Sequence, residues 1–172
     1  MEAILIGFMG SGKTTVGQLL AQRLQTAHAD LDDLIVQAAG RPITQIFAEH
    51  GEPYFRGLEQ QTLRQAMRGA GVLSTGGGTP TVAANATILT HSPIPVIWLQ
   101  ASDATILKRV TGDTQRPLVN ELKVDELLAL KHRRERLYAA AADLIMPTDA
   151  LTPVKIVQAI TDWLAQPQVH RA

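Results

Sequence analysis

The sequence predicts an α/β protein in which helices cover both faces of a parallel β-sheet. Short runs of β-type residues alternate with longer helical stretches, which is typical of βαβ units. The runs are apolar almost throughout rather than alternating, as strands covered on both faces require. No repeat or Gly/Ser linker divides the 172 residues, so we expect one domain over residues 1–172.

Five runs are predicted to form strands and six stretches to form helices. The predicted strands are residues 3–6, 27–31, 72–75, 95–100 and 144–147. The predicted helices are residues 13–25, 53–68, 81–89, 103–110, 124–142 and 153–165. Ligands of open parallel sheets bind beyond the carboxyl ends of the strands. The residues that directly follow each run are therefore the candidates for function.

The composition excludes several classes of protein. Sixteen basic residues balance sixteen acidic ones, so no net charge draws the chain to nucleic acid or to an anionic membrane. The lack of cysteine excludes disulfides, thiolate nucleophiles and Cys-bound zinc. Residues 1–9 do not read as a secretory leader, and no apolar run approaches the ~20 residues that span a bilayer. We expect a cytoplasmic monomer.

A phosphate-binding loop follows the first predicted strand. Residues 7–15 read GFMGSGKTT and match G-x-x-x-x-G-K-[ST]. Backbone N–H groups of such a loop surround an anion, and the next helix adds the positive end of its dipole. Lys13 is expected to reach the β- and γ-phosphates, and the Thr14 hydroxyl to bind Mg²⁺. The predicted ligand is a nucleoside triphosphate, contacted by Gly10, Ser11, Gly12, Lys13, Thr14 and Thr15.

Carboxylates follow the second predicted strand. In an extended chain Asp30 and Asp32 would point the same way, toward the ligand. One could hold Mg²⁺ through its waters while the other accepts hydrogen bonds from a substrate hydroxyl. Asp33 is expected to cap a helix or to face water.

Further segments offer groups for an anionic acceptor. Arg56 and Glu59 lie three residues apart on a predicted helix and share one face. Residues 76–78 are three glycines after the third run, where bare backbone suits contact with a ligand. Residues 112–118 carry Arg116 and predict a mobile flap that closes on the phosphates.

The basic stretch at residues 131–136 is interpreted mostly as a solvated helix face, with Lys131, Arg133 and Arg136 in water. The five histidines lack metal-ligand spacing, so surface or half-buried positions are expected for them. An NTP, Mg²⁺, carboxylates for hydroxyls and separate arginines together predict phosphoryl transfer to a small hydroxy acid.

The order and spacing of these motifs resemble the shikimate kinase family over roughly residues 3–165. The motifs are the loop at 7–15, Asp30-x-Asp32, Phe55-Arg56-x-x-Glu59, Gly76-Gly77-Gly78, Arg116-Pro117-Leu118 and Arg134-x-x-x-Tyr138. The resemblance implies the nucleoside monophosphate kinase type of fold, three α/β/α layers around a five-stranded parallel sheet of order 2-3-1-4-5. It also implies transfer of phosphate from ATP to the 3-hydroxyl of shikimate in aromatic amino acid biosynthesis.

The same resemblance implies roles for individual residues. Asp32 would bind the shikimate hydroxyls within a subregion at about 32–60, and Lys13, Asp32 and Arg116 would be catalytic. Arg116 would lie in a lid at about 112–124 and touch ATP phosphate. The residues implied for the shikimate carboxylate and backbone contacts are Arg56, Arg134, Gly77 and Gly78, and those implied for Mg²⁺ are Thr14 and, through water, Asp30.

The chain departs from the family at one place. Members often carry an arginine near the start of the last helix that stacks on adenine, but residues 148–153 contain none. Arg109 is then the candidate for that contact with ATP.

Other kinases of this fold, acting on gluconate or on a nucleotide, are the main alternative. A nucleotide kinase would need a basic pocket for a second phosphate, whereas paired carboxylates and three glycines suit a polyol acid. A GTP-dependent switch would need a D-x-x-G segment, which the sequence lacks.

Overall fold

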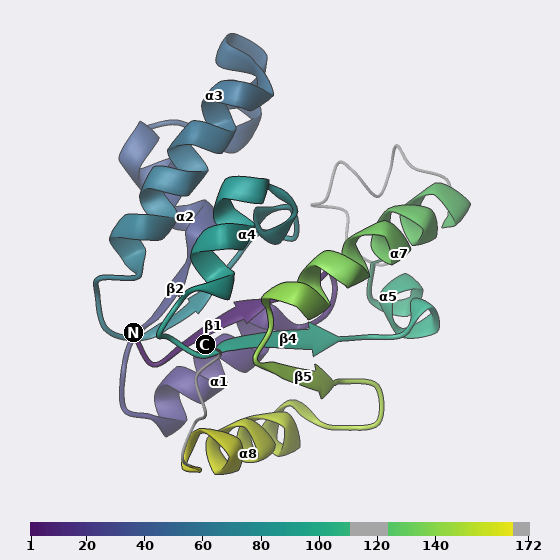
Figure 1. Ribbon diagram of the computed structural model, residues 1–172. Coiled ribbons are helices and arrows are strands. Elements are labelled where there is room, and N and C mark those ends of the chain that lie inside the picture. The colour runs from purple at the N-terminus through teal and green to yellow at the C-terminus, as the bar shows by residue number, and fades with distance from the viewer. Residues whose placement is uncertain (111–123, 167–172) are drawn as a thin grey trace.

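Five parallel strands form the sheet at the centre of the molecule (Figure 1). The computed structural model describes residues 1–110 and 124–166. The strands are β1 (Ala3–Ile6), β2 (His28–Asp30), β3 (Val72–Ser74), β4 (Val96–Gln100) and β5 (Leu144–Pro147). Their order is β2-β3-β1-β4-β5, and each neighbouring pair is parallel. This confirms the parallel sheet and the strand order that the family resemblance implied.

Helices cover both faces of the sheet, which confirms the three layers (Figure 1). The helices are α1 (Lys13–Arg23), α2 (Leu31–Ala39), α3 (Ile43–Ala66), α4 (Ala83–Thr90), α5 (Asp103–Val110), α7 (Val124–Ala141) and α8 (Pro153–Leu164), with a 3₁₀ turn η1 (Thr79–Thr81). Helices α1 and α8 share one face, and α2, α3, α4 and α7 share the other.

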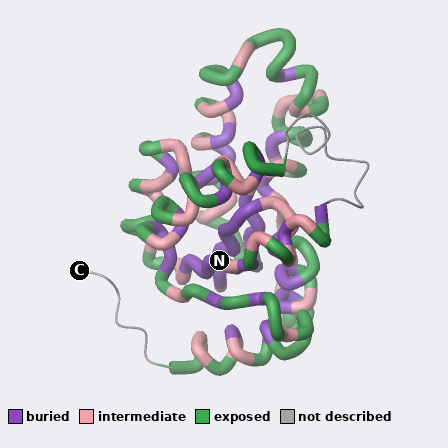
Figure 2. Tube along the Cα trace, turned by 90° about the vertical axis from the view of Figure 1, so that its right-hand side faces the viewer, coloured by how far each residue is buried: buried purple, intermediate pink, exposed green. Residues whose placement is uncertain are grey.

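The central strand β1 explains why its sequence is apolar at every position. Its residues alternate between two core clusters: Ala3 and Leu5 pack with α1 and α8, and Ile4 and Ile6 pack with the opposite helix layer. All four are fully buried. Figure 2 shows buried residues along the centre of the molecule and exposed residues on the outer sides of the helices. A strand with two buried faces has no polar side, so it cannot alternate.

The sequence interpretation missed helix α2 and the first part of α3. The second strand ends at Asp30, whose backbone is extended and whose Oδ1 accepts a hydrogen bond from the backbone N–H of Asp32 at 3.0 Å. Asp30 is therefore the N-cap of α2, and the strand predicted over 27–31 stops before Leu31. In α3, Gly51 has a φ of 76° and a ψ of 177°, so the predicted helix at 53–68 matches only the part after this kink.

No helix in the described part of the chain is both long enough and apolar enough to cross a bilayer.

Two glycine substitutions test how the backbone is constrained. At Gly71 φ is +113°, and a Cβ atom would lie 2.5 Å from the carbonyl oxygen of Ala27. We expect Gly71→Ala to lower the free energy of unfolding by about 2 kcal/mol or more. Gly57 lies inside α3, where a Cβ atom would meet nothing within 4 Å. Gly57→Ala should therefore raise the free energy of unfolding by about 0.5–1 kcal/mol.

Denaturant unfolding of both variants measures the difference. Two changes of the same sign would contradict this account of the two positions.

Candidate active site

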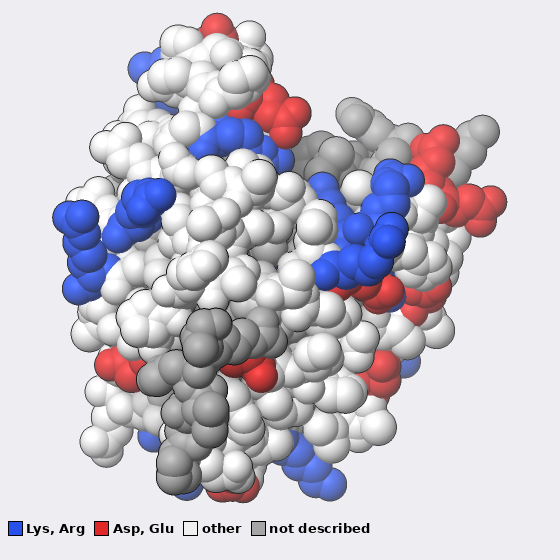
Figure 3. Space-filling view, viewed as in Figure 1, with Lys and Arg blue, Asp and Glu red and all other residues white. Residues whose placement is uncertain are grey.

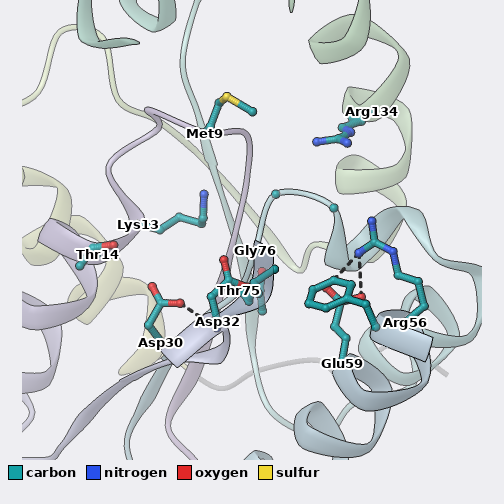
Figure 4. A pocket seen from close by; sticks show the side chains of 14 residues that line it. Met9, Lys13, Thr14, Asp30, Asp32, Arg56, Glu59, Thr75, Gly76 and Arg134 are labelled. Atoms are coloured by element: carbon teal, nitrogen blue, oxygen red, sulfur yellow. Dashed lines mark hydrogen bonds and ion pairs between the residues drawn. The ribbon is translucent and has the colours of Figure 1, made fainter. Parts of the chain in front are cut away.

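A pocket of about 440 Å³ lies beyond the carboxyl ends of β1, β2 and β3. The phosphate loop, α2, α3, the glycine segment after β3 and α7 all contribute to it. Its lining includes these residues predicted from the sequence: Lys13, Thr14, Asp30, Asp32, Arg56, Gly77, Gly78 and Arg134. Figure 4 shows Lys13 and Thr14 on one side of the pocket and Arg56 and Arg134 on the other. The structure thus brings most of the predicted site residues into one space.

The phosphate loop forms the side of the pocket nearest α1. Gly12 precedes the first residue of α1, has a φ of +98°, and no side chain caps this helix end. Lys13 Nζ donates hydrogen bonds to the carbonyl oxygens of Gly7 and Phe8 at 2.9 and 3.0 Å. The hydroxyl of Ser11 is buried and has no hydrogen-bond partner within residues 1–110 and 124–166. A buried polar hydroxyl beside an uncapped helix N-terminus fits a phosphate group.

Asp30 and Asp32 reach the pocket by a different route from the one expected. They do not alternate along one strand, because Asp30 ends the strand and caps α2 while Asp32 lies in the first helical turn. Both still line the pocket. The cap forms at Asp30, and Asp33 is exposed to water, as one of its two expected roles required. Thr14 and Asp30 offer the hard oxygen atoms that Mg²⁺ prefers.

The environment of Asp32 makes its carboxylate an unusually strong base. Burial, followed by the negative charges of Asp30 and Glu59, raises the pKa of Asp32 to about 6, although the Lys13 cation acts in the opposite direction. At pH 7 the carboxylate is thus mostly ionised, yet it binds a proton far more readily than an ordinary aspartate. A general base works best with a pKa close to the working pH.

Arg56 is held by a buried carboxylate. Its Nη1 lies 3.0 Å from Glu59 Oε2, and Glu59 is only 1% exposed. Glu59 also accepts hydrogen bonds from Thr79 Oγ1 at 2.9 Å and from Asn85 Nδ2 at 3.0 Å. The exposed Glu52 completes the set, with its carboxylate 3.1 Å from Arg56 Nη2. The sequence interpretation found the Arg56–Glu59 pair but missed Thr79 and Asn85.

The three glycines leave space for side chains of the site. A Cβ atom at Gly76 would lie 2.9 Å from Asp32 Oδ1, and one at Gly78 would lie 3.1 Å from Arg56 Nη2. Larger residues at these two positions would therefore displace the carboxylate or the guanidinium group. The sequence interpretation explained the glycines by contact with a ligand, and the structure adds this second reason.

Arg134 reaches the pocket from α7. Its guanidinium lies 5.8 Å from the centre of the Phe8 ring. One turn later, the hydroxyl of Tyr138 donates a hydrogen bond to the carbonyl oxygen of Gly77 at 2.7 Å. Burial raises the pKa of Tyr138 to about 12, so the hydroxyl keeps its proton at neutral pH. Tyr138 thus joins α7 to the glycine segment beside Arg134.

Not every predicted residue lies in this pocket. Arg109 instead contacts the backbone of the phosphate loop, where its Nη1 donates to the carbonyl oxygens of Gly10 and Ser11 at 3.1 and 3.3 Å. Arg116 and the rest of the lid predicted at about 112–124, apart from residue 124, lie outside the described residues.

The prediction that Lys131 faces water is wrong. Its side chain is buried and pairs with Asp103 and Glu135. The prediction is confirmed for Arg133 and Arg136, which are exposed, and Figure 3 shows basic side chains gathered over α7.

Within the described residues, no group of three His, Asp or Glu side chains could hold a metal ion.

Comparison with known proteins agrees with this geometry. The family model described as shikimate kinase matches residues 9–165. Among curated relatives, the shikimate kinase of Limosilactobacillus fermentum is 45% identical over 165 residues, with 95% of each chain covered. That of Enterococcus faecalis is 40% identical over 169 residues, covering 96% of this chain and 100% of the relative.

Solved structures give the same result. Shikimate kinase from Acinetobacter baumannii in complex with shikimate superposes with a TM-score of 0.85 and 32% identity, covering 95% of this chain and 92% of the other. Shikimate kinase from Aquifex aeolicus superposes with a TM-score of 0.78 and 32% identity, over 95% of this chain and 96% of the other. On sequence, fold and the arrangement of the pocket, this chain belongs to the shikimate kinase family.

Proposed function

We infer that this chain is a shikimate kinase, a small-molecule kinase that transfers the terminal phosphate of ATP to the 3-hydroxyl of shikimate. The products are shikimate 3-phosphate and ADP, and the reaction belongs to aromatic amino acid biosynthesis. The observation that carries this inference is the pocket itself, which places a phosphate-loop lysine, the half-buried carboxylate of Asp32 and two arginines around one space. We also propose that the enzyme works as a cytoplasmic monomer without a nucleic-acid partner, in keeping with its balanced charge.

The acceptor is proposed to bind on the arginine side of the pocket. A carboxylate accepts paired hydrogen bonds from a guanidinium group, and Arg56 and Arg134 both line this side. Asp32 accepts hydrogen bonds from the acceptor hydroxyls, and the backbone at Gly77 and Gly78 completes the contact surface.

The nucleotide is proposed to bind on the loop side. The N–H groups of residues 10–15 surround the phosphates, Lys13 contacts the transferring group, and Arg109 lies near the loop to contact adenine. Thr14 and, through water, Asp30 would hold Mg²⁺, which supplies positive charge against the phosphates when bound. From the family resemblance, Arg116 is proposed to contact the transferring phosphate.

In the proposed chemical step, Asp32 acts as the general base. The oxygen of the 3-hydroxyl forms a bond to the γ-phosphorus, and the bond from that phosphorus to the bridging oxygen of ADP breaks. The hydroxyl proton goes to the Asp32 carboxylate, whose pKa of about 6 suits it to accept a proton near neutral pH. Phosphoryl transfer otherwise needs mostly positioning and charge neutralisation, which the lysine and arginines supply.

The acceptor can be tested by ADP release from purified protein with ATP and Mg²⁺. We expect turnover with shikimate, little with quinate or gluconate, and none with AMP, because only a polyol acid of the right shape reaches the arginines and Asp32 together. Chelation of Mg²⁺ should abolish the activity. Faster turnover with AMP or gluconate than with shikimate would overturn the assignment.

Asp32→Asn should lower kcat by about 10²-fold or more, because the amide cannot accept the hydroxyl proton. The same change should stabilise the fold at pH 7. The folded-state pKa of about 6 lies above the value of about 3.9 for an unfolded aspartate. The free energy of unfolding therefore falls as the pH rises through these values. The amide avoids this loss of about 1–3 kcal/mol.

Rates and melting temperatures at pH 5 and pH 7.5 measure both effects. In the unsubstituted enzyme, kcat/KM should fall about tenfold per pH unit below pH 6. A folded Asp32→Asn variant that keeps more than a tenth of the normal kcat would exclude Asp32 as the base.

Arg56→Gln should raise the KM for shikimate by about 10- to 100-fold, because the acceptor carboxylate loses a charged partner. The matched control is Arg64→Gln, which changes an exposed arginine of the same helix and should leave KM unchanged. The methyl ester of shikimate provides a second measurement, since it lacks the negative charge. Esterification should raise KM less in Arg56→Gln than in the unsubstituted enzyme. An equal rise of KM in both proteins would show that Arg56 does not bind the shikimate carboxylate.

A further inference from the structure

Lys131 is a buried cation outside the pocket. It is only 5% exposed, and its Nζ donates hydrogen bonds to Asp103 Oδ1 at 2.8 Å and to Glu135 Oε1 at 2.6 Å. Asp103 also accepts a hydrogen bond from His132 Nε2 at 2.8 Å. Burial favours the neutral amine, but the bonds to Asp103 and Glu135 outweigh it and raise the pKa of Lys131 above its ordinary value. Lys131 therefore stays charged, and nothing in the phosphoryl transfer described above uses it.

Lys131 lies on the same face of α7 as Arg134. Arg134 follows it by three residues, and Tyr138 follows Arg134 by four, the spacings that place helical side chains one above another. Lys131 ties this face to Asp103, and Tyr138 ties it to the carbonyl oxygen of Gly77. Arg134 thus lies between two points at which α7 is attached to the rest of the protein.

Phe8 lies next to both Lys131 and Arg134. Lys131 and Tyr138 line one small internal space together with Phe8 and Trp98. The ring of Phe8 is also the surface over which the guanidinium of Arg134 lies. A shift of α7 at Lys131 would therefore also change the position of Arg134 over the Phe8 ring.

The partner of Lys131 belongs to the nucleotide side of the protein. Asp103 is the first residue of α5, and Arg109 of the same helix donates to the carbonyl oxygens of the phosphate loop. The ion pair between Lys131 and Asp103 thus connects the helix that carries an acceptor arginine to the helix that touches the phosphate loop.

We propose that Lys131, through its ion pair with Asp103, is a positioning residue that holds Arg134 in place for the acceptor carboxylate. The proposal rests on the carboxylate-binding role given to Arg134 above. Misplacing a binding group by about 1 Å can reduce an enzyme's activity by as much as 10²-fold, so the geometry of α7 matters for the reaction.

The test compares Lys131→Met with a matched control. Methionine keeps much of the apolar chain but removes the charge, and Asp103 and Glu135 remain partly exposed, so water can solvate them. We expect the KM for shikimate to rise about tenfold. The control, Arg136→Met, removes an exposed cation from the same helix and should leave KM unchanged. Asp103→Asn, which breaks the pair from the other side, should act in the same direction with a smaller rise.

A double-variant cycle separates positioning from general stability. If Lys131 acts through Arg134, Lys131→Met should raise KM in the otherwise unchanged enzyme but have almost no further effect in an Arg134→Met background. Its effect on the melting temperature should be the same in both backgrounds.

Several results would overturn the proposal. A normal KM in both Lys131→Met and Asp103→Asn, with only a lower melting temperature, would make the ion pair purely structural. An equal rise in KM in both backgrounds would show that Lys131 does not act through Arg134. An unchanged KM in Arg134→Met alone would overturn this proposal and the role of Arg134, while shikimate turnover by the unsubstituted enzyme would still support the proposed function.

Discussion

The site depends on close packing where three neighbouring parallel strands end. Parallel strands deliver their carboxyl ends to one edge of the sheet, so the segments after β1, β2 and β3 must share the same small volume. The glycine segment after β3 is the point of contact. A Cβ atom at Gly77 would lie 3.6 Å from the backbone nitrogen of Met9, and one at Gly76 would lie 2.9 Å from Asp32. The bare backbone at Gly76 leaves room for the Asp32 carboxylate, and Gly77 lies in ordinary van der Waals contact with the phosphate loop, so both segments border one space.

The crowding of charges at this edge sets the chemistry of Asp32. Burial raises its pKa most, and the largest contributions from other carboxylates come from Asp30 and Glu59. Each of these neighbours already has a partner: Asp30 accepts from the first turn of α2, and Glu59 binds Arg56. Asp32 is thus the carboxylate whose ionised form is destabilised by the negative charges gathered here. With Asp32 in its proposed role as the base, the site gives up some stability to obtain a proton acceptor near neutral pH.

Much of the fold could be predicted because the central strand is buried on both faces and its residues must therefore be apolar. Strand β1 is buried on both faces, so its apolar run is visible without any knowledge of its neighbours. Helix α2 was missed because Leu31 was interpreted as the last residue of the strand, and only the cap at Asp30 marks the change. The phosphate loop and paired aspartates were visible as local patterns, although the aspartates converge by capping rather than by strand alternation.

Residues whose role depends on distant partners could not be found in the same way. Lys131 stands in a basic stretch that resembles an exposed face, and its partner Asp103 lies 28 residues earlier in the sequence. Asn85 binds Glu59 across 26 residues, and Thr79 does so across 20. Nothing in the local sequence distinguishes these side chains from ordinary surface polar groups, because only the fold decides which of them is buried against a charge.

The two arginines that we propose bind the acceptor, Arg56 and Arg134, are held in different ways. Arg56 is fixed by direct ion pairs, so its guanidinium is already partly neutralised by Glu59 and by Glu52. Arg134 is oriented by the attachment of its helix and by the face of Phe8, an aromatic surface that leaves its positive charge in place. A carboxylate bound between the two thus meets one arginine of fixed geometry and one whose position follows α7. Because α7 is tied to α5 through Lys131, our proposal couples the fit of the acceptor to the helix that contacts the phosphate loop.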